Sequence, residues 1–182
     1  FINIIIASLP TMITGFVLVK LNLIDQLRNI HVISLTTILF GLILYISDKS
    51  KIQKKISNDL NFKDAILIGF LQTLSLIPGV SRSGITITTA RFLNFDRVES
   101  AKISFLFSIP ILIATSSYII LKMIETKNLE ITIQNFWAVF FSFIFSLITL
   151  KFFIKFLKKF NMVFFVIYRI VLGIVILAYA YN

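Results

Sequence analysis

The sequence contains no cysteine, a single histidine and only eight acidic residues among its 182 positions. The absence of cysteine excludes a disulfide framework and a thiolate metal site. Carboxylates are scarce, and no apolar segment carries a pair of them. The three glutamates are all expected at loop positions: Glu99, Glu125 and Glu130. The residues present therefore supply no evident general base and no set of carboxylate metal ligands.

Apolar residues are abundant instead, at 58% of the chain, with 20 phenylalanines and a mean hydropathy of +0.96. This composition is typical of an integral membrane protein. Apolar stretches long enough for candidate membrane crossings occur five times. They are Phe1–Val19, Val32–Ser47, Ile103–Leu121, Phe136–Leu150 and Met162–Tyr181. The sequence predicts an all-α polytopic membrane protein.

The formal net charge of +10 admits two interpretations, nucleic-acid binding or contact with a membrane surface. The membrane is favoured because the lysines fall in short runs between apolar segments. Ser47–Asp64 and Lys151–Phe160 are the richest in lysine, so both are predicted to be cytoplasmic loops. The less basic loops Lys20–His31 and Lys122–Ile133 are predicted to face outward. We also expect both chain ends on the outer side.

Two further apolar runs are too short to cross a bilayer. Asp64–Leu76 has 13 residues and Ile85–Phe95 has 11. As helices they reach roughly 20 and 16 Å, against a hydrocarbon core of about 30 Å. They flank a Pro-Gly break. The predicted sides of the loops are consistent with one another only if residues 64–95 enter the membrane and leave it on the same side. The pattern therefore predicts a re-entrant helical hairpin over residues 64–95, with Pro78–Gly84 at its tip.

The tip combines groups that suit an anion. Gly79 and Gly84 permit close backbone approach. Either Ser81 or Ser83 is expected to cap a helix that begins near Ile85, which leaves free N–H groups at its N-terminus. Arg82 adds a permanent charge with a fork that matches phosphate oxygens, and Thr86 adds a hydroxyl. The alternative interpretation is a simple helix break with an arginine that extends to the membrane surface.

The tip motif and two later segments also resemble those of a known protein family. Gln72, the run Pro78-Gly79-Val80-Ser81-Arg82-Ser83-Gly84-Ile85-Thr86, and the later Ser104-Phe105-Leu106-Phe107-Ser108-Ile109-Pro110 resemble the undecaprenyl pyrophosphate phosphatase family. The stretch Phe165–Arg169 is similar to the last helix of that family. The resemblance implies hydrolysis of a polyprenyl diphosphate to the monophosphate carrier lipid of cell-wall synthesis, bacitracin resistance, and a site in the bacterial inner membrane that opens to the periplasm.

The resemblance also implies roles for particular residues. Ser81, Arg82 and Thr86 fall on active-site positions, and Gly79, Ser83, Gly84 and Gln72 are expected to bind the substrate. A divalent cation, magnesium or calcium, is implied as a cofactor, with no ligands for it in this chain. The family's first hairpin, with its glutamate pair, serine run and histidine, has no counterpart here. Because the chain starts at Phe1 inside an apolar run, we expect the C-terminal two thirds of a family member, without the N-terminal half of the active site and inactive when isolated.

The family's inverted repeat then gives a division of the chain. Residues 1–63 would hold the last two crossings of the first repeat and a cytoplasmic loop, and residues 64–182 the second repeat. Several alternatives stay open: a lipid-phosphate transporter or flippase, a non-catalytic scaffold, a hydroxyl or a water as nucleophile, and a monomer or a homodimer. His31 is expected to be a solvated loop residue. Arg169 is expected either to pair with a buried polar group or to extend to the cytoplasmic surface.

Overall fold

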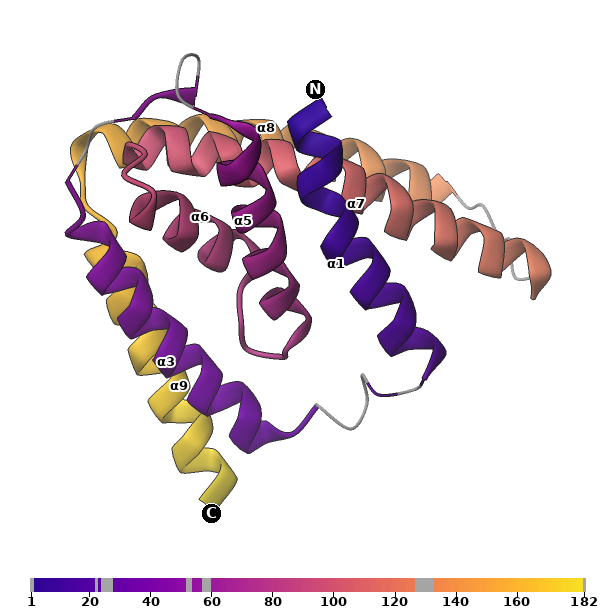
Figure 1. Cartoon of the computed structure of the whole chain (residues 1–182). Coiled ribbons are helices and arrows are strands. Elements are labelled where there is room, and N and C mark those ends of the chain that lie inside the picture. The colour runs from indigo at the N-terminus through magenta and orange to yellow at the C-terminus, as the bar shows by residue number, and fades with distance from the viewer. Residues whose placement is uncertain are drawn as a thin grey trace.

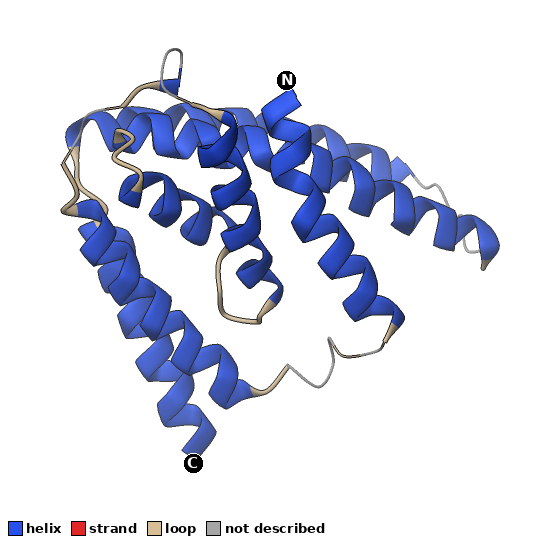
Figure 2. Ribbon diagram, viewed as in Figure 1, coloured by secondary structure: helices blue, strands red, loops and turns tan. Residues whose placement is uncertain are grey.

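The computed structural model describes residues 2–21, 23, 28–51, 54–56, 60–126 and 133–181. Within these ranges the chain forms helices and no strand (Figures 1 and 2). Helices long and apolar enough to cross a membrane are α1 (Ile2–Lys20), α3 (Ile30–Asp48), α7 (Arg97–Glu125), α8 (Ile133–Lys159) and α9 (Val163–Tyr181). The predicted all-α polytopic membrane architecture with five spanning helices is thereby confirmed.

Two short helices, α5 (Phe62–Gln72) and α6 (Arg82–Phe92), occupy the predicted hairpin, and a 3₁₀ turn, η1 (Thr73–Leu76), extends α5. At 11 residues, each α-helix spans about 16 Å, half of a bilayer core. The two helices contact each other and enclose a non-helical segment, Ile77–Ser81, which we call the tip loop (Figure 1). Because α6 begins at Arg82, three residues before the expected start, Arg82 lies in the first helical turn.

Both outer ends of this helix pair lie on one side of the molecule. The segment before α5 meets the segment after α6, because the Lys54 N–H donates to the Asn94 carbonyl (3.0 Å) and the Asp96 N–H donates back to the Lys54 carbonyl (3.3 Å). The C-terminal end of α3 and the N-terminal end of α9 reach the same place through Asp48. We call this lysine-rich side the basic end. The position of both outer ends at the basic end agrees with a hairpin and excludes one continuous helix over 64–95. The division of the chain into two repeats stays a prediction.

The chain ends lie at opposite ends of the molecule (Figure 1). The Asn3 Nδ2 group donates to the Leu60 carbonyl (3.4 Å), which places the start of α1 at the basic end. The prediction that both chain ends face away from the lysine-rich loops is therefore wrong for the N-terminal end. The physical reason is parity: α1 runs away from the basic end and α3 returns to it, so α1 must start where α3 finishes.

The loop predicted at Lys151–Phe160 is also wrong, because α8 continues to Lys159. Aromatic side chains one turn apart support this extension, since the rings of Phe156 and Phe160 stack with centroids 4.8 Å apart. Phe156 also packs edge-to-face on Phe165 of α9 (5.7 Å). The lysines between these rings place their charges in water while their stems follow the helix.

Three further expectations concern single residues. Glu99 lies in the first turn of α7 and Glu125 is its last residue, so neither occupies a loop, while Glu130 lies outside the described residues. His31 is the second residue of α3, and its ring packs against Tyr181 at 5.3 Å. The loop placement of His31 is therefore wrong, because the Asn29 side chain accepts the His31 N–H and starts the helix there.

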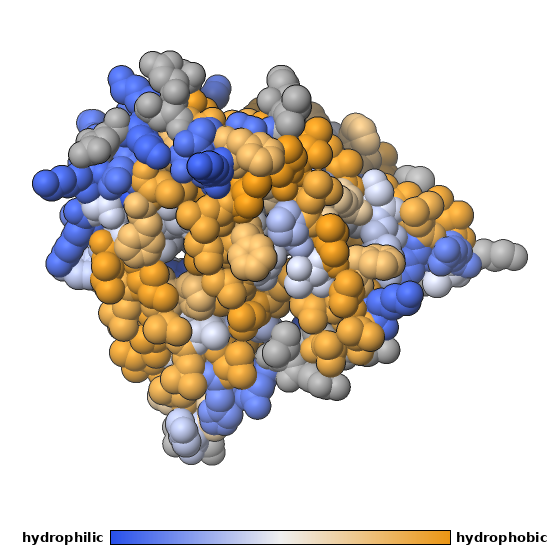
Figure 3. All heavy atoms as spheres, viewed as in Figure 1, coloured by the Kyte–Doolittle hydropathy of each residue, from blue (hydrophilic) through white to orange (hydrophobic). Residues whose placement is uncertain are grey.

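A charged cluster at the basic end joins α3, α6, α7 and α9. The Asp48 carboxylate, 8% exposed, accepts two hydrogen bonds from Arg97 (2.7 and 3.1 Å) and one from the Met162 N–H (3.1 Å). The guanidinium of Arg91, 1% exposed, donates to the carbonyls of Asp48, Ser50 and Phe95 at 2.6–2.9 Å. Elsewhere the face in Figure 3 is mainly apolar, as lipid contact requires.

We predict that Asp48→Ala lowers the free energy of unfolding by on the order of 3 to 5 kcal/mol, because the buried Arg91 and the partly exposed Arg97 lose their anion. Lys102→Ala is the control, since it removes an ion pair whose lysine is 49% exposed and whose contribution is about 0 to 1 kcal/mol. Thermal unfolding in detergent measures both variants. Equal melting temperatures for the two would contradict a supporting role for the cluster.

Candidate functional site

The tip loop is held by hydroxyl groups of α3. The Thr36 hydroxyl donates to the Pro78 carbonyl (2.7 Å), and the Thr37 hydroxyl lies 3.4 Å from the Gly79 carbonyl. Gly79 has a φ of +87°, and a Cβ atom there would collide with the Thr36 hydroxyl. Only glycine combines this backbone angle with so close an approach. The Pro-Gly break therefore has one fixed conformation against α3.

Ser81 begins α6. Its side-chain oxygen accepts the Gly84 N–H (3.1 Å) and lies 3.2 Å from the Ser83 hydroxyl. Of the two predicted caps, Ser81 is the one that forms. The other N–H groups of the first turn have no intrahelical acceptor, so the positive end of the helix dipole faces the tip. Both serine side chains are exposed there.

Arg169 of α9 completes the tip, although it is 90 residues from Gly79. Its side chain is largely buried, and Nη2 donates to the Gly79 carbonyl (2.9 Å) while Nε lies 3.4 Å from the Thr37 carbonyl. A Cβ atom on Gly84 would come within 2.7 Å of Nη1, so that nitrogen rests on the first turn of α6. Of the two expectations for Arg169, burial with polar partners is confirmed and extension to the surface is wrong.

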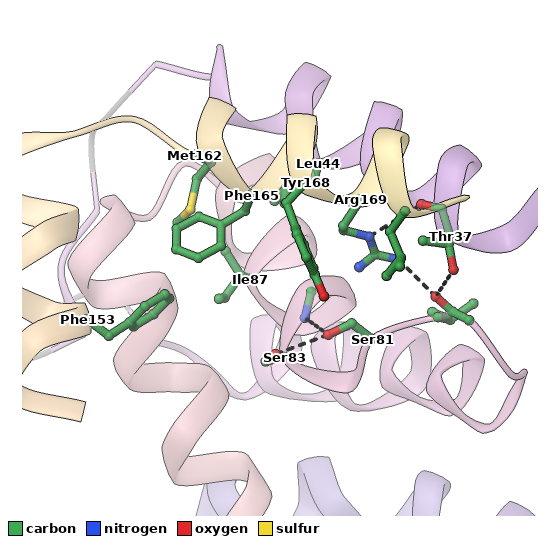
Figure 4. Close-up of a pocket in the computed structure, with 14 residues that line it drawn as sticks. Thr37, Leu44, Ser81, Ser83, Ile87, Phe153, Met162, Phe165, Tyr168 and Arg169 are labelled. Atoms are coloured by element: carbon green, nitrogen blue, oxygen red, sulfur yellow. Dashed lines mark hydrogen bonds between the residues drawn. The ribbon is translucent and has the colours of Figure 1, made fainter. Parts of the chain in front are cut away.

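These groups surround a cavity of 440 Å³, which we call the tip cavity. In Figure 4 the guanidinium of Arg169 and the hydroxyls of Ser81 and Ser83 lie toward the tip, and Tyr168 points toward the serines. The opposite end is apolar, with Ile87, Leu44, Met162, Phe165 and Phe153. The cavity thus has a hydroxyl and cationic end and an apolar end.

Two predicted site residues lie elsewhere. Thr86 and Gln72 are fully buried, and the Thr86 hydroxyl lies 3.2 Å from Gln72 Oε1 and donates to the Arg82 carbonyl (2.7 Å). The Gln72 amide is 3.4 Å from the Thr11 hydroxyl of α1. Neither side chain lines the tip cavity.

Arg82 belongs to the same face of α6 as Thr86, because residues four apart on a helix are neighbours. Its half-buried side chain does not line the tip cavity, and it makes no ion pair among the described residues. The structure therefore brings Gly79, Ser81, Ser83 and Gly84 together with Arg169 on one side of the helix start. It places Arg82, Thr86 and Gln72 on the other side.

A divalent cation does not fit the described lining of the tip cavity. Magnesium and calcium prefer carboxylate and other oxygen ligands in sets, and the lining offers two serines and a threonine beside an arginine. Within the described ranges no group of three histidine, cysteine or acidic side chains is close enough to hold a metal ion. We derive no chemical step through such a cation.

Sequence reasoning underrated Arg169. The available signal was an arginine within an apolar helix with a mean hydropathy of 2.5, where an ionisable residue is a functional candidate by default. The two serines and the two glycines were found because they sit in one short motif. The place of Arg169 in the site was harder to predict because its partners, Thr37 and Gly79, are remote in the sequence.

Five apolar helices long enough to span a membrane, together with a short helix pair whose tip is capped by a hydroxyl, define a polytopic membrane protein. Residues 1–175 match the family described as bacitracin resistance protein BacA, and the chain belongs to this family. This confirms the family suggested by the PGVSRSGIT motif.

Curated relatives with the name undecaprenyl-diphosphatase support this family assignment. The chain is 50% identical to one from Pelagibacter ubique over 128 residues, which are 70% of this chain and 50% of the relative. It is 40% identical to one from Jannaschia sp. (97% and 66%) and 38% identical to one from Ruegeria pomeroyi (99% and 67%). The chain thus spans about half to two thirds of the length of these relatives. These matches give no support for a missing N-terminal half of the site, which stays a prediction.

We predict that Gly79→Ala destabilises the tip by more than about 1 to 2 kcal/mol, the usual cost of a left-handed backbone for a residue with a Cβ, because the collision with Thr36 adds to it. Gly15→Ala is the matched control, since its Cβ would meet only Leu76 at 3.6 Å and the change favours a helix interior. Thermal unfolding in detergent should separate the two variants. Equal stability would show that the tip loop is not held as described.

Proposed function

We propose that this protein hydrolyses the phosphoanhydride bond of undecaprenyl diphosphate, or of another polyprenyl diphosphate, to the monophosphate and inorganic phosphate. The reaction would recycle the carrier lipid for cell-wall synthesis and confer resistance to bacitracin. The supporting observation is the capped N-terminus of α6, which presents two serine hydroxyls beside Arg169 at one end of a cavity whose other end is apolar. Such a cavity suits a molecule with an anionic head and a hydrocarbon tail. The names of the relatives agree with this substrate class.

The tip offers several donors to phosphate oxygens. The unpaired N–H groups in the first turn of α6 favour an anion, as helix N-termini do generally. The hydroxyls of Ser81 and Ser83 lie beside them. Arg169 uses Nε and Nη2 for the carbonyls of Thr37 and Gly79, which leaves Nη1 for a phosphate oxygen. We propose Gly79, Ser83 and Gly84 as the residues that shape this phosphate site.

Arg82 approaches the same helix start from the other side. Phosphoryl transfer depends mainly on positioning and on electrostatic stabilisation of the transferred group. We propose that Arg82 and Ser81 stabilise the charge that develops on that group. The Thr86 hydroxyl donates to the Arg82 carbonyl and lies against the Gln72 amide, so the proposed role of Thr86 and Gln72 is to position the first turn of α6. The described lining of the tip cavity has no carboxylate or histidine, so it provides no general base.

The orientation follows from charge. Because lysine-rich segments favour the cytoplasmic side, the basic end is proposed to face the cytoplasm of the bacterial inner membrane. The tip loop lies at the far ends of α5 and α6 from it. We therefore propose that the site opens toward the periplasmic side, where a polyprenyl diphosphate would enter from the membrane.

We predict that Arg82→Ala lowers phosphate release from a polyprenyl diphosphate by about 100- to 1000-fold, because a preorganised donor to developing charge is lost. Arg82→Lys should lose much of the rate although it keeps the charge, since lysine cannot grip two oxygens. Thr86→Val should cost less, because it removes one neutral hydroxyl contact. Phosphate release by the whole protein in detergent micelles measures all three variants.

Lys63→Ala is the control for the loss of one positive charge, because Lys63 is exposed in the first turn of α5 at the basic end. It should release phosphate at the normal rate. If Arg82→Ala matched that control, the assignment of Arg82 to the site would be wrong. If the unaltered protein bound the diphosphate without releasing phosphate, a transport function would replace hydrolysis.

A further inference from the structure

The tip cavity borders a second cavity. A groove of 790 Å³, which we call the α8 groove, lies between α7 and α8, and both cavities are lined by Ser83 and Phe153. Phe105 of α7 and Phe141 and Phe145 of α8 form aromatic walls, and no charged side chain lines it. Its volume falls within the roughly 300 to 1,000 Å³ range of ligand pockets.

We propose that the α8 groove holds the hydrocarbon chain of the substrate and that Phe153 sets which chains pass into it. This inference rests on the proposed function, because it assumes a lipid diphosphate at the tip. The chain is bonded covalently to the diphosphate, so its first units must leave the tip through a cavity that touches the phosphate site. Ser83 contributes to the phosphate site and to the groove, which makes the groove such an exit.

A third cavity among the described residues is apolar and serves for comparison. It has a volume of 390 Å³, lies between α1 and α7, and is lined by Thr11, Gly15 and Ile111 among others. It shares no lining residue with the tip cavity. A chain attached to a phosphate at Ser83 would not reach it directly. Continuity at Ser83 and Phe153 therefore favours the α8 groove.

Phe153 lies where the tip cavity borders the α8 groove and would narrow the passage between them. Its ring packs edge-to-face against Phe105 of α7, at 5.9 Å between centroids, and against Phe165 of α9, at 5.4 Å. These contacts hold the ring between the two cavities, and Figure 4 shows it at the opposite end of the tip cavity from Arg169. The neighbouring Phe152 is 67% exposed and lines neither cavity, so it provides a matched control on the same helix.

The first experiment compares substrates of different length with the whole protein in detergent. Phe153→Trp should lower kcat/KM for a C55 polyprenyl diphosphate by about tenfold more than for isopentenyl diphosphate, whose five carbons do not enter the groove. Phe153→Ala should not impair the long substrate selectively, and Phe152→Trp should leave the ratio unchanged. An equal loss on both substrates with Phe153→Trp would overturn the inference and leave the proposed function standing. Absence of hydrolysis of every diphosphate by the unaltered protein would overturn the proposed function.

A second experiment does not depend on turnover. A prenyl diphosphate with a benzophenone on its chain should, on irradiation, label α8 between Ala138 and Phe153, as mapped by mass spectrometry. Labelling should fall with Phe153→Trp and not with Phe152→Trp. Labels on Thr11 or Ile111 would overturn the inference in favour of the α1–α7 cavity. Ser146→Leu places a larger side chain in the α8 groove. If this variant dissociated a dimer in detergent and left the labelling of α8 unchanged, the groove would hold a second copy of the chain and the inference would be overturned.

Discussion

A break in the backbone inside an apolar protein leaves carbonyl groups without helical hydrogen-bond donors, and the arrangement of the tip follows from this constraint. The Pro78 carbonyl accepts from Thr36, and the Gly79 carbonyl accepts from Arg169. The donors come from α3 and α9, which pack side by side, and a Cβ on Gly173 of α9 would come within 2.5 Å of the Ile38 side chain. Close packing of these two helices thus fixes the positions of the donors, and the donors fix the tip.

The start of α6 presents two chemically different sides. One side meets the tip cavity through Ser81 and Ser83, which are exposed there. The other side carries Arg82 and the buried pair of Thr86 and Gln72, which joins α6 to α5 and, through Thr11, to α1. The same helix end is therefore both the proposed phosphate site and a junction of the bundle. The packing of α1 and α5 is thus connected to the first turn of α6 through Gln72 and Thr86.

The sequence predicts the spanning helices and the interrupted helix pair because both depend on local properties: run length, hydropathy and a Pro-Gly break. It misplaces the end of α8 because the lysines there have long stems that are compatible with helix. It finds Ser81 as one of two caps but cannot choose, since the choice depends on where α6 starts. The separation of Arg82 and Thr86 from the serines follows from helical periodicity. An arginine within an apolar helix marks Arg169 as a candidate, but no local pattern connects it with Gly79.

The distance along the chain between Arg169 and the tip has a consequence for biosynthesis. A membrane protein is made from its N-terminus, so α3, α5 and α6 enter the membrane well before the ribosome reaches α9. Until then the Gly79 carbonyl lacks its arginine donor, and the tip loop rests on the α3 hydroxyls alone. The tip loop therefore reaches its described set of hydrogen bonds only after α9 has packed against α3.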